Sequence, residues 1–468
     1  MSEENILSKT EQLKNDLFMQ KKNGYFRIDE NEADLAFDFA EGYKKFLNSS
    51  KTERLCVKNI LKMAKDAGFS EFDDEKQYKT GDKVYVNHRD KCVILCVFGK
   101  NPVKDGVRIA AAHLDSPRID LKPNPLYEAE QLGYFKTHYY GGIKKYQWPT
   151  IPLAMHGVVV KADGSRVDIS IGENNDEPKF VITDLLPHLA QEQYKNKLGD
   201  AIKGEDLNIL IGSRPFNDDK EALAVKLNIM KILNEKYGIV EGDFESAELE
   251  FVPADPVCDI GFDRSLVGGY GHDDRVCSYP AVMAALEAET PEYTVLSVLT
   301  DKEEIGSTGN TGLQSAFMVN FIKDIAQMQG TKAYKVLRNS KCLSADVTAA
   351  YDPTFASVNE KNNAAFCNYG VCIMKYTGSR GKSGTSDANA EYMGEIRKML
   401  NDRNIIWQTG ELGKVDAGGG GTVAMYIAEL DVDTVDLGVP VLSMHAPFEV
   451  ISKLDLYMAY KAFSAFFE

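Results

Sequence analysis

Long apolar runs are absent from this chain of 468 residues. No uninterrupted apolar stretch reaches the ~18 residues that a membrane-spanning helix needs. The first residues, Met1-Ser-Glu-Glu-Asn-Ile6, contain neither the basic segment nor the apolar segment of a secretion signal. We therefore expect a cytoplasmic protein that has no partner in a membrane.

Basic residues are fewer than acidic ones. The sequence has 54 Lys and Arg against 70 Asp and Glu, which gives a formal net charge of −16. A surface of this sign repels the phosphates of nucleic acids, so we expect no nucleic acid partner. It leaves the charge of a small substrate open, because a pocket can carry a local charge that differs from the net charge.

Paired cysteine motifs are also missing. The eight cysteines show no zinc-finger or redox spacing, and Cys92 and Cys96 are separated by three residues within a strand-like run. Buried thiols in a reducing cytoplasm fit this pattern better than a disulfide framework does. Internal repeats and low-complexity segments are absent too. A chain of this length has room for two or three globular domains.

Strand-like and helix-like patterns alternate over the first and last parts of the sequence, as in α/β proteins. The expected helices cover residues 30–48, 52–67, 275–287, 387–401 and 454–467. The expected strands cover residues 84–86, 92–98, 107–112, 294–300, 342–347 and 435–439. These elements predict one α/β domain that is built from both ends of the chain.

The middle of the chain has a different pattern. Turn residues and short alternating segments dominate there, and residues 158–160 and 167–171 predict a β-hairpin. The simplest account is an α/β domain that is interrupted by a mostly β insert. We assign residues 1–121 and 255–468 to the α/β domain and residues 122–254 to the insert.

Acids and histidines follow most of the predicted strands of the α/β domain. In open α/β sheets, functional groups gather outside the carboxyl ends of the strands, so we expect these side chains to meet at one place. They are, in chain order, His113, Asp115, Glu303, Glu304, Asp346 and His445.

These side chain types match the needs of two zinc ions. Zinc takes imidazole and carboxylate ligands, and two ions roughly 3.5–4 Å apart can share one carboxylate and clamp a water between them. Either Asp273 or Asp274, before a predicted helix, offers the shared carboxylate. Adjacent Glu303 and Glu304 suit a division in which one acts as a base and the other binds metal. Asp115 is placed to accept a hydrogen bond from a metal-binding histidine or to orient the base.

Each of these residues has an ordinary interpretation when it is taken alone. A histidine at a strand end is most often structural, a Glu-Glu pair is usually a solvated turn, and Asp274 is a natural helix N-cap. The glycine-rich segment 418–421 lacks the Gly-Lys-Ser/Thr ending of a phosphate-binding loop. It is the combination of acids and histidines at the strand ends that predicts a metal site.

Five motifs occur in a fixed order along the chain. They read Ala111-Ala-His-Leu-Asp-Ser-Pro-Arg118, Asp274-Arg-Val276, Asp301-Lys-Glu-Glu-Ile-Gly-Ser307, Leu343-Ser-Ala-Asp346 and Leu442-Ser-Met-His445. Their order and their residues resemble the motifs of the M18 metallopeptidase family, the group of aspartyl aminopeptidase and vacuolar aminopeptidase I. The resemblance extends across nearly the whole chain. The resemblance implies a mixed-sheet α/β catalytic domain of the zinc-aminopeptidase type with an inserted, mostly β dimerisation domain.

The resemblance also implies a site for two divalent metal ions per chain, zinc by preference, with Co²⁺ or Mn²⁺ as substitutes. One ion would be held by His113, Asp274 and Asp346. The other would be held by Asp274, Glu304 and His445, with Asp274 as the bridge.

The resemblance further implies that Glu303 is the general base and that Asp115 is the partner that orients the site. The second motif departs from the family pattern. Members of the family often read Leu-Asp-Asn there, whereas this chain reads Asp273-Asp274-Arg275. The register to the following helix favours Asp274 as the bridging residue.

A further implied residue lies in the insert. Leu186-Pro-His-Leu-Ala190 resembles a family segment whose histidine reaches the active site of a neighbouring subunit, which makes His188 a candidate substrate-binding residue. The resemblance implies dimers that assemble into a tetrahedral dodecamer. The expected reaction is hydrolysis of an N-terminal residue, acidic or neutral, from a short peptide.

Two other functions compete with this hypothesis. A two-metal phosphohydrolase uses similar ligands but needs Lys or Arg around the phosphate, and the motifs offer only Arg118, Arg275 and Lys302 for that role. A catalytically silent assembly protein of the same fold would have no need of Glu303. Near the glycine-rich loops, Lys382 is a candidate contact for a substrate carboxylate, as is Lys414.

Overall fold

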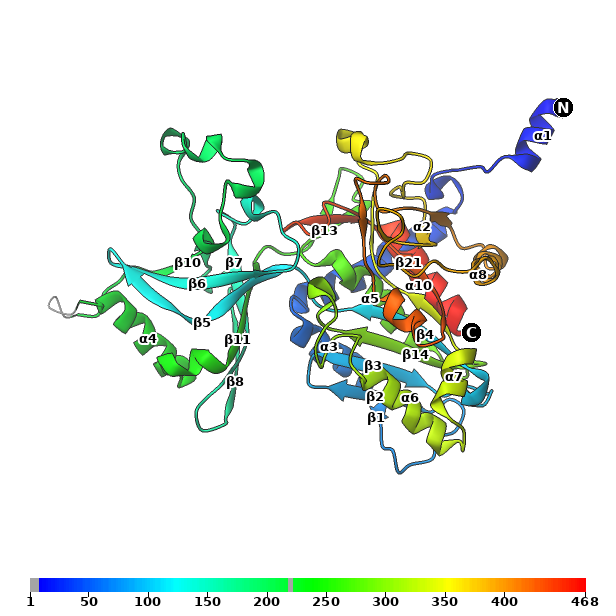
Figure 1. Ribbon diagram of the computed structural model, residues 1–468, viewed down its shortest axis with the longest axis horizontal. Helices are drawn as coiled ribbons and strands as arrows, with labels where there is room; N and C mark the ends of the chain where they lie inside the picture. The colour runs from blue at the N-terminus through cyan, green and yellow to red at the C-terminus, as the bar shows by residue number, and fades with distance from the viewer. Residues whose placement is uncertain (1–7, 218–221) are drawn as a thin grey trace.

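The protein has two lobes, which Figure 1 shows side by side. This computed structural model describes residues 8–217 and 222–468. The larger lobe is built on a mixed nine-stranded sheet with the order β1-β2-β3-β14-β4-β15-β21-β17-β19. Its strands are β1 (Ser70–Glu71), β2 (Lys83–His88), β3 (Cys92–Val97), β4 (Val107–His113), β14 (Thr294–Thr300), β15 (Lys341–Ser344), β17 (Val371–Met374), β19 (Trp407–Thr409) and β21 (Asp433–Gly438).

Helices cover both faces of this sheet. On β4, Ala110 and Ala112 belong to the apolar core of one face, and Ile109 and Ala111 to that of the other. The first core also contains side chains of α2 (Glu30–Ser49), α3 (Glu53–Asp66), α5 (His272–Glu287), α8 (Ala390–Asp402) and α10 (Lys453–Phe467). The second contains side chains of α6 (Phe317–Met328), α7 (Ala333–Asn339) and α9 (Ala424–Ala428). Burial on both faces explains why the central strands are almost continuously apolar.

Sequence signals fix several helix ends. The Thr52 side chain accepts a hydrogen bond from Leu55 N–H at the start of α3, and Gly68 follows the helix with a φ of +86°. Ser452 caps α10 by accepting from Asp455 N–H. These helices lie within a residue or two of their predicted positions. The sequence analysis did not assign α6.

The central strands place the site. β14 pairs antiparallel with β3 and parallel with β4, and β15 pairs parallel with β4 on its other side. In this register His113 lies beside Thr300, and Ser344 lies beside Ala111. The carboxyl ends of three strands that are distant in sequence therefore meet at one edge of the sheet.

The smaller lobe is an antiparallel seven-stranded sheet with the order β8-β7-β11-β5-β6-β10-β9. All of its strands come from residues 118–253, so the sheet begins four positions before the predicted boundary at residue 122. The predicted hairpin is present as β7 paired with β8. The strands are β5 (Arg118–Ala129), β6 (Leu132–Tyr140), β7 (Leu153–Val160), β8 (Arg166–Ile171), β9 (Val181–Ile182), β10 (Ile209–Gly212) and β11 (Ala247–Pro253).

One helix, α4 (Ala224–Tyr237), adds Leu233 to the core of the insert, which also contains Trp148 and Phe251. This helix was not predicted from the sequence. Residues 183–206 form a series of short turns, drawn in green, that project from the upper side of this lobe (Figure 1).

The remaining elements are small. A five-stranded sheet has the order β12-β13-β23-β22-β16, a two-stranded sheet pairs β18 with β20, and α1 (Lys9–Leu17) extends from the body (Figure 1). Among the described residues, no helix is long and apolar enough to cross a membrane. The small strands are β12 (Cys258–Ile260), β13 (Leu266–Gly269), β16 (Thr348–Ala349), β18 (Gly378–Ser379), β20 (Gly419–Gly420), β22 (Pro440–Leu442) and β23 (Glu449–Ser452).

Candidate metal centre

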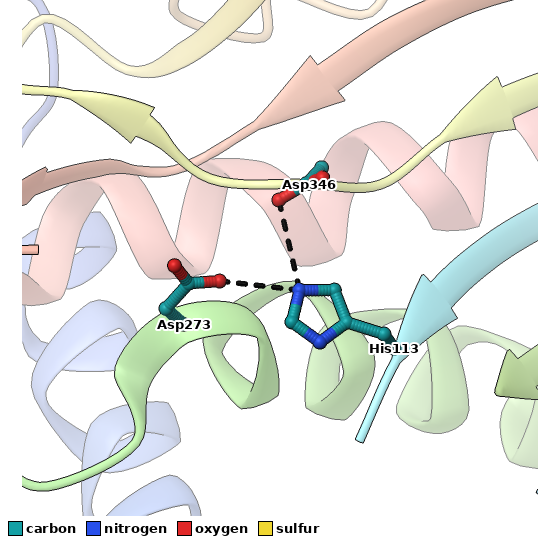
Figure 2. A group of neighbouring side chains, drawn as sticks. All are labelled: His113, Asp273 and Asp346. Carbon is teal, nitrogen blue, oxygen red and sulfur yellow. Dashed lines mark ion pairs between the residues drawn. The ribbon is translucent and has the colours of Figure 1, made fainter. Parts of the chain in front are cut away.

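His113 ends β4 and is fully buried. Its Nδ1 lies 3.0 Å from the backbone oxygen of Asp115, which can only accept, so Nδ1 carries the proton and Nε2 is left with a lone pair. Nε2 lies 3.2 Å from Asp273 Oδ1 and 3.8 Å from Asp346 Oδ1 (Figure 2). A buried imidazole oriented in this way is typical of a metal ligand.

His445 follows β22 and has the same arrangement. Its Nδ1 donates to the backbone oxygen of Gly142 at 2.8 Å, and its Nε2 lies 3.1 Å from Asp273 Oδ2 and 3.5 Å from Glu304 Oε2. Gly142 belongs to the loop after β6, so the insert orients one of the two imidazoles. His445 has a φ of +64°, a left-handed conformation that a non-glycine residue adopts at some energetic cost.

Asp273, rather than Asp274, lies between the two histidines. Each of its carboxylate oxygens faces one imidazole, whereas Asp274 Oδ2 lies 3.3 Å from the backbone nitrogen of His113, whose N–H it accepts. The choice of Asp274 as the bridge therefore does not fit the geometry. It relied on the register of the following helix, but both aspartates have non-helical φ and ψ values. Helical spacing cannot say where either side chain points.

Glu303 and Glu304 lie on a turn that follows β14. Lys302 before it and Gly306 after it have left-handed backbones, with φ values of +69° and +93°. This turn lets two adjacent side chains approach the same place. Glu304 Oε2 faces His445, and Glu303 Oε2 lies 3.9 Å from His113 Nε2.

Asp115 holds this turn. Its Oδ1 accepts from Glu303 N–H at 3.1 Å, and its Oδ2 accepts from Glu304 N–H at 3.2 Å. Oδ1 also lies 3.3 Å from His113 Nδ1. Asp115 thus orients both glutamates and one histidine, which combines the two roles that the sequence left open for it.

The ligand atoms form three groups whose members lie within 4.8 Å of one another. Among the described residues, the buried atoms His113 Nε2, Asp273 Oδ1 and Glu304 Oε1 form no hydrogen bond of ordinary geometry. Unpaired buried polar atoms of this kind are costly unless something else satisfies them. The three groups are His113 with Asp273 and Asp346, His113 with Glu303 and Glu304, and Asp273 with Glu304 and His445.

The electrostatics of the site also favour positive charge. Burial and the nearby carboxylates raise the pKa of Asp346, and in the same way that of Glu304, well above the ordinary range. Burial would lower the pKa of His445, yet Asp273 and Glu304 raise it to about 10. A site that attracts protons this strongly also attracts metal cations, so the residues fit divalent ions.

Glu449 completes the site and was missed in the sequence analysis. It lies on β23, is 1% exposed, and accepts from His445 N–H at 2.7 Å and from Asp273 N–H at 3.1 Å. One carboxylate thus fixes the backbones of two residues that face each other. No pattern marks it, because a single glutamate at the start of a short strand looks like an ordinary surface residue.

Other candidate residues lie elsewhere. His188, on the projecting segment, is exposed and belongs to none of the three groups of ligand atoms. Lys382 donates to Asp387 and lies 3.7 Å from the centre of the Tyr376 ring. Lys414 lines an open hollow of about 460 Å³ beside the glycine-rich segment.

Comparisons with known proteins identify the family that the chain resembles. A family model described as aminopeptidase I zinc metalloprotease (M18) matches residues 46–467. A probable M18 family aminopeptidase 1 of Clostridium acetobutylicum is 50% identical over 460 residues, which cover 97% of this chain and 99% of the relative. Its counterpart in Thermotoga maritima is 44% identical over 455 residues, or 96% of this chain and 99% of the relative.

Solved structures match equally well. The M18 aminopeptidase of Thermotoga maritima has a TM-score of 0.92 at 44% identity, covering 96% of this chain and 99% of that chain. Aminopeptidase I of Clostridium acetobutylicum has a TM-score of 0.91 at 47% identity, covering 97% and 100%. The mApe1 dodecamer of S. cerevisiae shares the fold, with a TM-score of 0.74 at 20% identity, covering 92% and 96%.

Proposed function

The chain belongs to the M18 family of zinc metalloproteases and is an aminopeptidase, a hydrolase that acts on the N-terminal residues of peptides; on that premise we propose that it works with two divalent metal ions. The observation that carries the proposal is the Asp273 carboxylate, which presents one oxygen to His113 and the other to His445. A carboxylate that faces two histidines in this way can bridge two metal ions.

In this proposal each ion has three protein ligands. One ion is held by His113, Asp273 and Asp346. The other is held by Asp273, Glu304 and His445. Zinc suits these imidazole and carboxylate ligands, and Co²⁺ or Mn²⁺ would substitute.

The bound ions would lower the pKa of a water molecule and polarise the carbonyl group of the peptide bond that is cut. Glu303 accepts the proton of the attacking water and later passes it to the leaving amine. Burial, with Asp115 and Asp273 nearby, raises the pKa of Glu303, and a higher pKa makes a carboxylate a stronger base. Asp115 keeps the glutamate turn in place during both transfers.

The alternative of a phosphohydrolase loses support from the structure. Arg275 donates to Cys56 and to a backbone oxygen of residue 51. Arg118 pairs with three carboxylates, and Lys302 pairs with Asp301. The basic residues considered for a phosphate clamp are therefore already engaged within the protein.

We also propose that the insert pairs subunits and that the pairs assemble into a dodecamer, with His188 reaching the active site of the other subunit. The projecting segment 183–206 supports this role, because large apolar side chains that are costly to leave in water are exposed along it. They are Leu185, Leu186, Leu189, Tyr194 and Leu198. The expected cytoplasmic location stays a prediction.

Metal analysis and substrate comparison test the central proposal. Purified protein should contain close to two divalent ions per chain, and replacing His113, Asp273 or His445 should lower that number. A set of aminoacyl anilides with acidic, apolar and basic residues should show turnover with an acidic or neutral preference, while a phosphate ester should not react. Full peptidase activity in metal-free protein would overturn the mechanism.

A further inference from the structure

Asp115 has a hydrogen-bond partner in the insert. Tyr140, the last residue of β6, donates its hydroxyl to Asp115 Oδ2 at 2.8 Å. The same carboxylate accepts the backbone N–H groups of Glu303 and Glu304. A side chain of the smaller lobe therefore touches the group that holds the glutamate turn of the larger lobe.

The Tyr140 ring is itself held in place. Arg118 is its direct partner across the β5–β6 pair, and the guanidinium carbon of Arg118 lies 3.8 Å from the centre of the ring. Arg118 is 5% exposed, so this stacking occurs largely away from solvent, where a cation over an aromatic ring is most favourable.

Three carboxylates from different elements fix the guanidinium in turn. Arg118 Nε donates to Asp120 on β5 at 2.8 Å, and its Nη2 lies 3.3 Å from Glu250 on β11. Nη1 lies 3.5 Å from Glu53, at the start of α3 in the larger lobe. Arg118 therefore joins both lobes and leaves the Tyr140 ring little freedom to turn.

We propose that Tyr140, held by Arg118, is a positioning residue for peptide hydrolysis: it fixes the rotation of the Asp115 carboxylate and thereby the placement of Glu303. The proposal rests on the proposed role of Glu303 as base. Without the hydroxyl, Asp115 Oδ2 keeps only Glu304 N–H as a hydrogen-bond partner among the described residues, and the carboxylate gains freedom to rotate. Proton transfer is sensitive to shifts of well under 1 Å, so a looser turn lowers the rate without removing any reacting group.

Tyr140→Phe is a suitable variant, because it removes the hydroxyl and keeps the ring that stacks on Arg118. In the full-length, metal-loaded enzyme we expect kcat to fall ~10-fold, as when a group that supports a metal site from outside is lost. KM should stay within about twofold, because no substrate contact is altered. Metal content and thermal midpoint should match the parent enzyme. The matched control is Tyr139→Phe, which changes the neighbouring, partly exposed tyrosine of the same strand and should leave kcat unchanged.

Titration with a tight-binding transition-state analogue counts the competent sites and makes the test decisive. A lower kcat per competent site supports the positioning role. An unchanged kcat per site, with or without a smaller number of sites, overturns it. Glu303→Gln measured in parallel separates the two proposals: normal turnover of that variant overturns the base assignment, whereas an inactive Glu303→Gln beside a fully active Tyr140→Phe overturns the positioning role alone.

Discussion

Each side chain of the site has two hydrogen-bonding atoms, and the contact made by one of them decides where the other points. His113 and His445 each give one ring nitrogen to a backbone oxygen, which turns the other nitrogen toward Asp273. Asp115 and Glu449 likewise accept backbone N–H groups of other site residues with both of their carboxylate oxygens. These hydrogen bonds therefore fix the direction in which the side chains of the site point.

The adjacent glutamates should respond differently to the same change. Glu303→Gln removes the proton acceptor but spares the proposed ligands, so activity should fall by ~10²–10⁴-fold at unchanged metal content. Glu304→Gln should lower both activity and metal content. Steady-state kinetics with metal analysis of both variants measures this. Near-normal turnover of Glu303→Gln would show that another group, with Asp115 as the first suspect, accepts the proton.

Glu449→Ala should weaken metal binding although Glu449 is not a proposed ligand. Losing the acceptor for two backbone N–H groups frees His445 and Asp273 to move, and losing such outer partners typically costs ~10–100-fold in metal affinity. Competition with a chelator of known affinity measures the effect. Glu429→Ala, at an exposed position, is the control and should keep the parent affinity. Equal affinities for all three proteins would contradict the role of Glu449.

At the level of secondary structure, the strands and the helix positions were largely predictable, because apolar runs and caps are local signals. The apolar run of residues 294–300, which two glutamates follow closely, predicted both β14 and the place of Glu303 and Glu304 in the site. The sequence analysis assigned no element to the region of helix α6, and helix α4 lies in a segment that was expected to be mostly β. Asp274 does not fit the geometry of a bridge, because the backbone at Asp273 and Asp274 departs from the helix that was used to place them. The part that Glu449 plays in the site could not be predicted, because it arises from tertiary contacts alone.

An ion-pair cluster joins three elements of the larger lobe. Asp259 on β12 accepts from Lys44 of α2 at 2.7 Å and lies 2.9 Å from Lys453 Nζ at the start of α10. Arg264 lies 2.6 Å from its other oxygen. Burial alone would raise the pKa of Asp259, but these three cations hold it well below its ordinary value.

The cluster predicts a pH-dependent loss of stability. A depressed pKa adds stability above the pKa of the unfolded chain, about 3.9, and that contribution is lost as the pH falls toward the folded-state value. Asp259→Asn should therefore unfold more easily than the parent at pH 7, by roughly 1–3 kcal/mol. The difference should narrow below about pH 4. Denaturant melts at several pH values measure this, with Asp34→Asn, an exposed change on α2, as the control. A difference that does not change with pH would contradict the ion-pair account.

For the molecule as a whole, the position of His188 makes a prediction about shared sites. His188 is exposed on the projecting segment and belongs to none of the groups of ligand atoms in its own chain. If it serves another subunit, His188→Ala should lower turnover without removing metal, and light scattering should show a large homo-oligomer. Leu198→Asp on the same segment should shift the assembly toward smaller species.

Mixing inactive subunits checks this arrangement directly. His188→Ala and Glu303→Gln chains, allowed to exchange, should recover part of the activity, because one site could take a sound residue from each chain. Mixing two preparations of Glu303→Gln is the control and should recover none. A fully active monomer, or no recovery in freely exchanging pairs, would contradict a shared site and leave the metal chemistry intact.

The pairing of β14 between β3 and β4 also determines the order in which the protein can take shape during synthesis. About 180 residues lie between the end of β4 and the start of β14, and all the described strands of the insert fall within that interval. A ribosome adding ~5–20 residues per second leaves the apolar edge of β4 without its neighbour for roughly 10–40 s. During that time the insert can form its own sheet, because none of its described strands pairs with a strand of the larger lobe's sheet. The smaller lobe, with its Gly142 loop, can therefore be folded before β14 pairs with β4, the strand that carries His113.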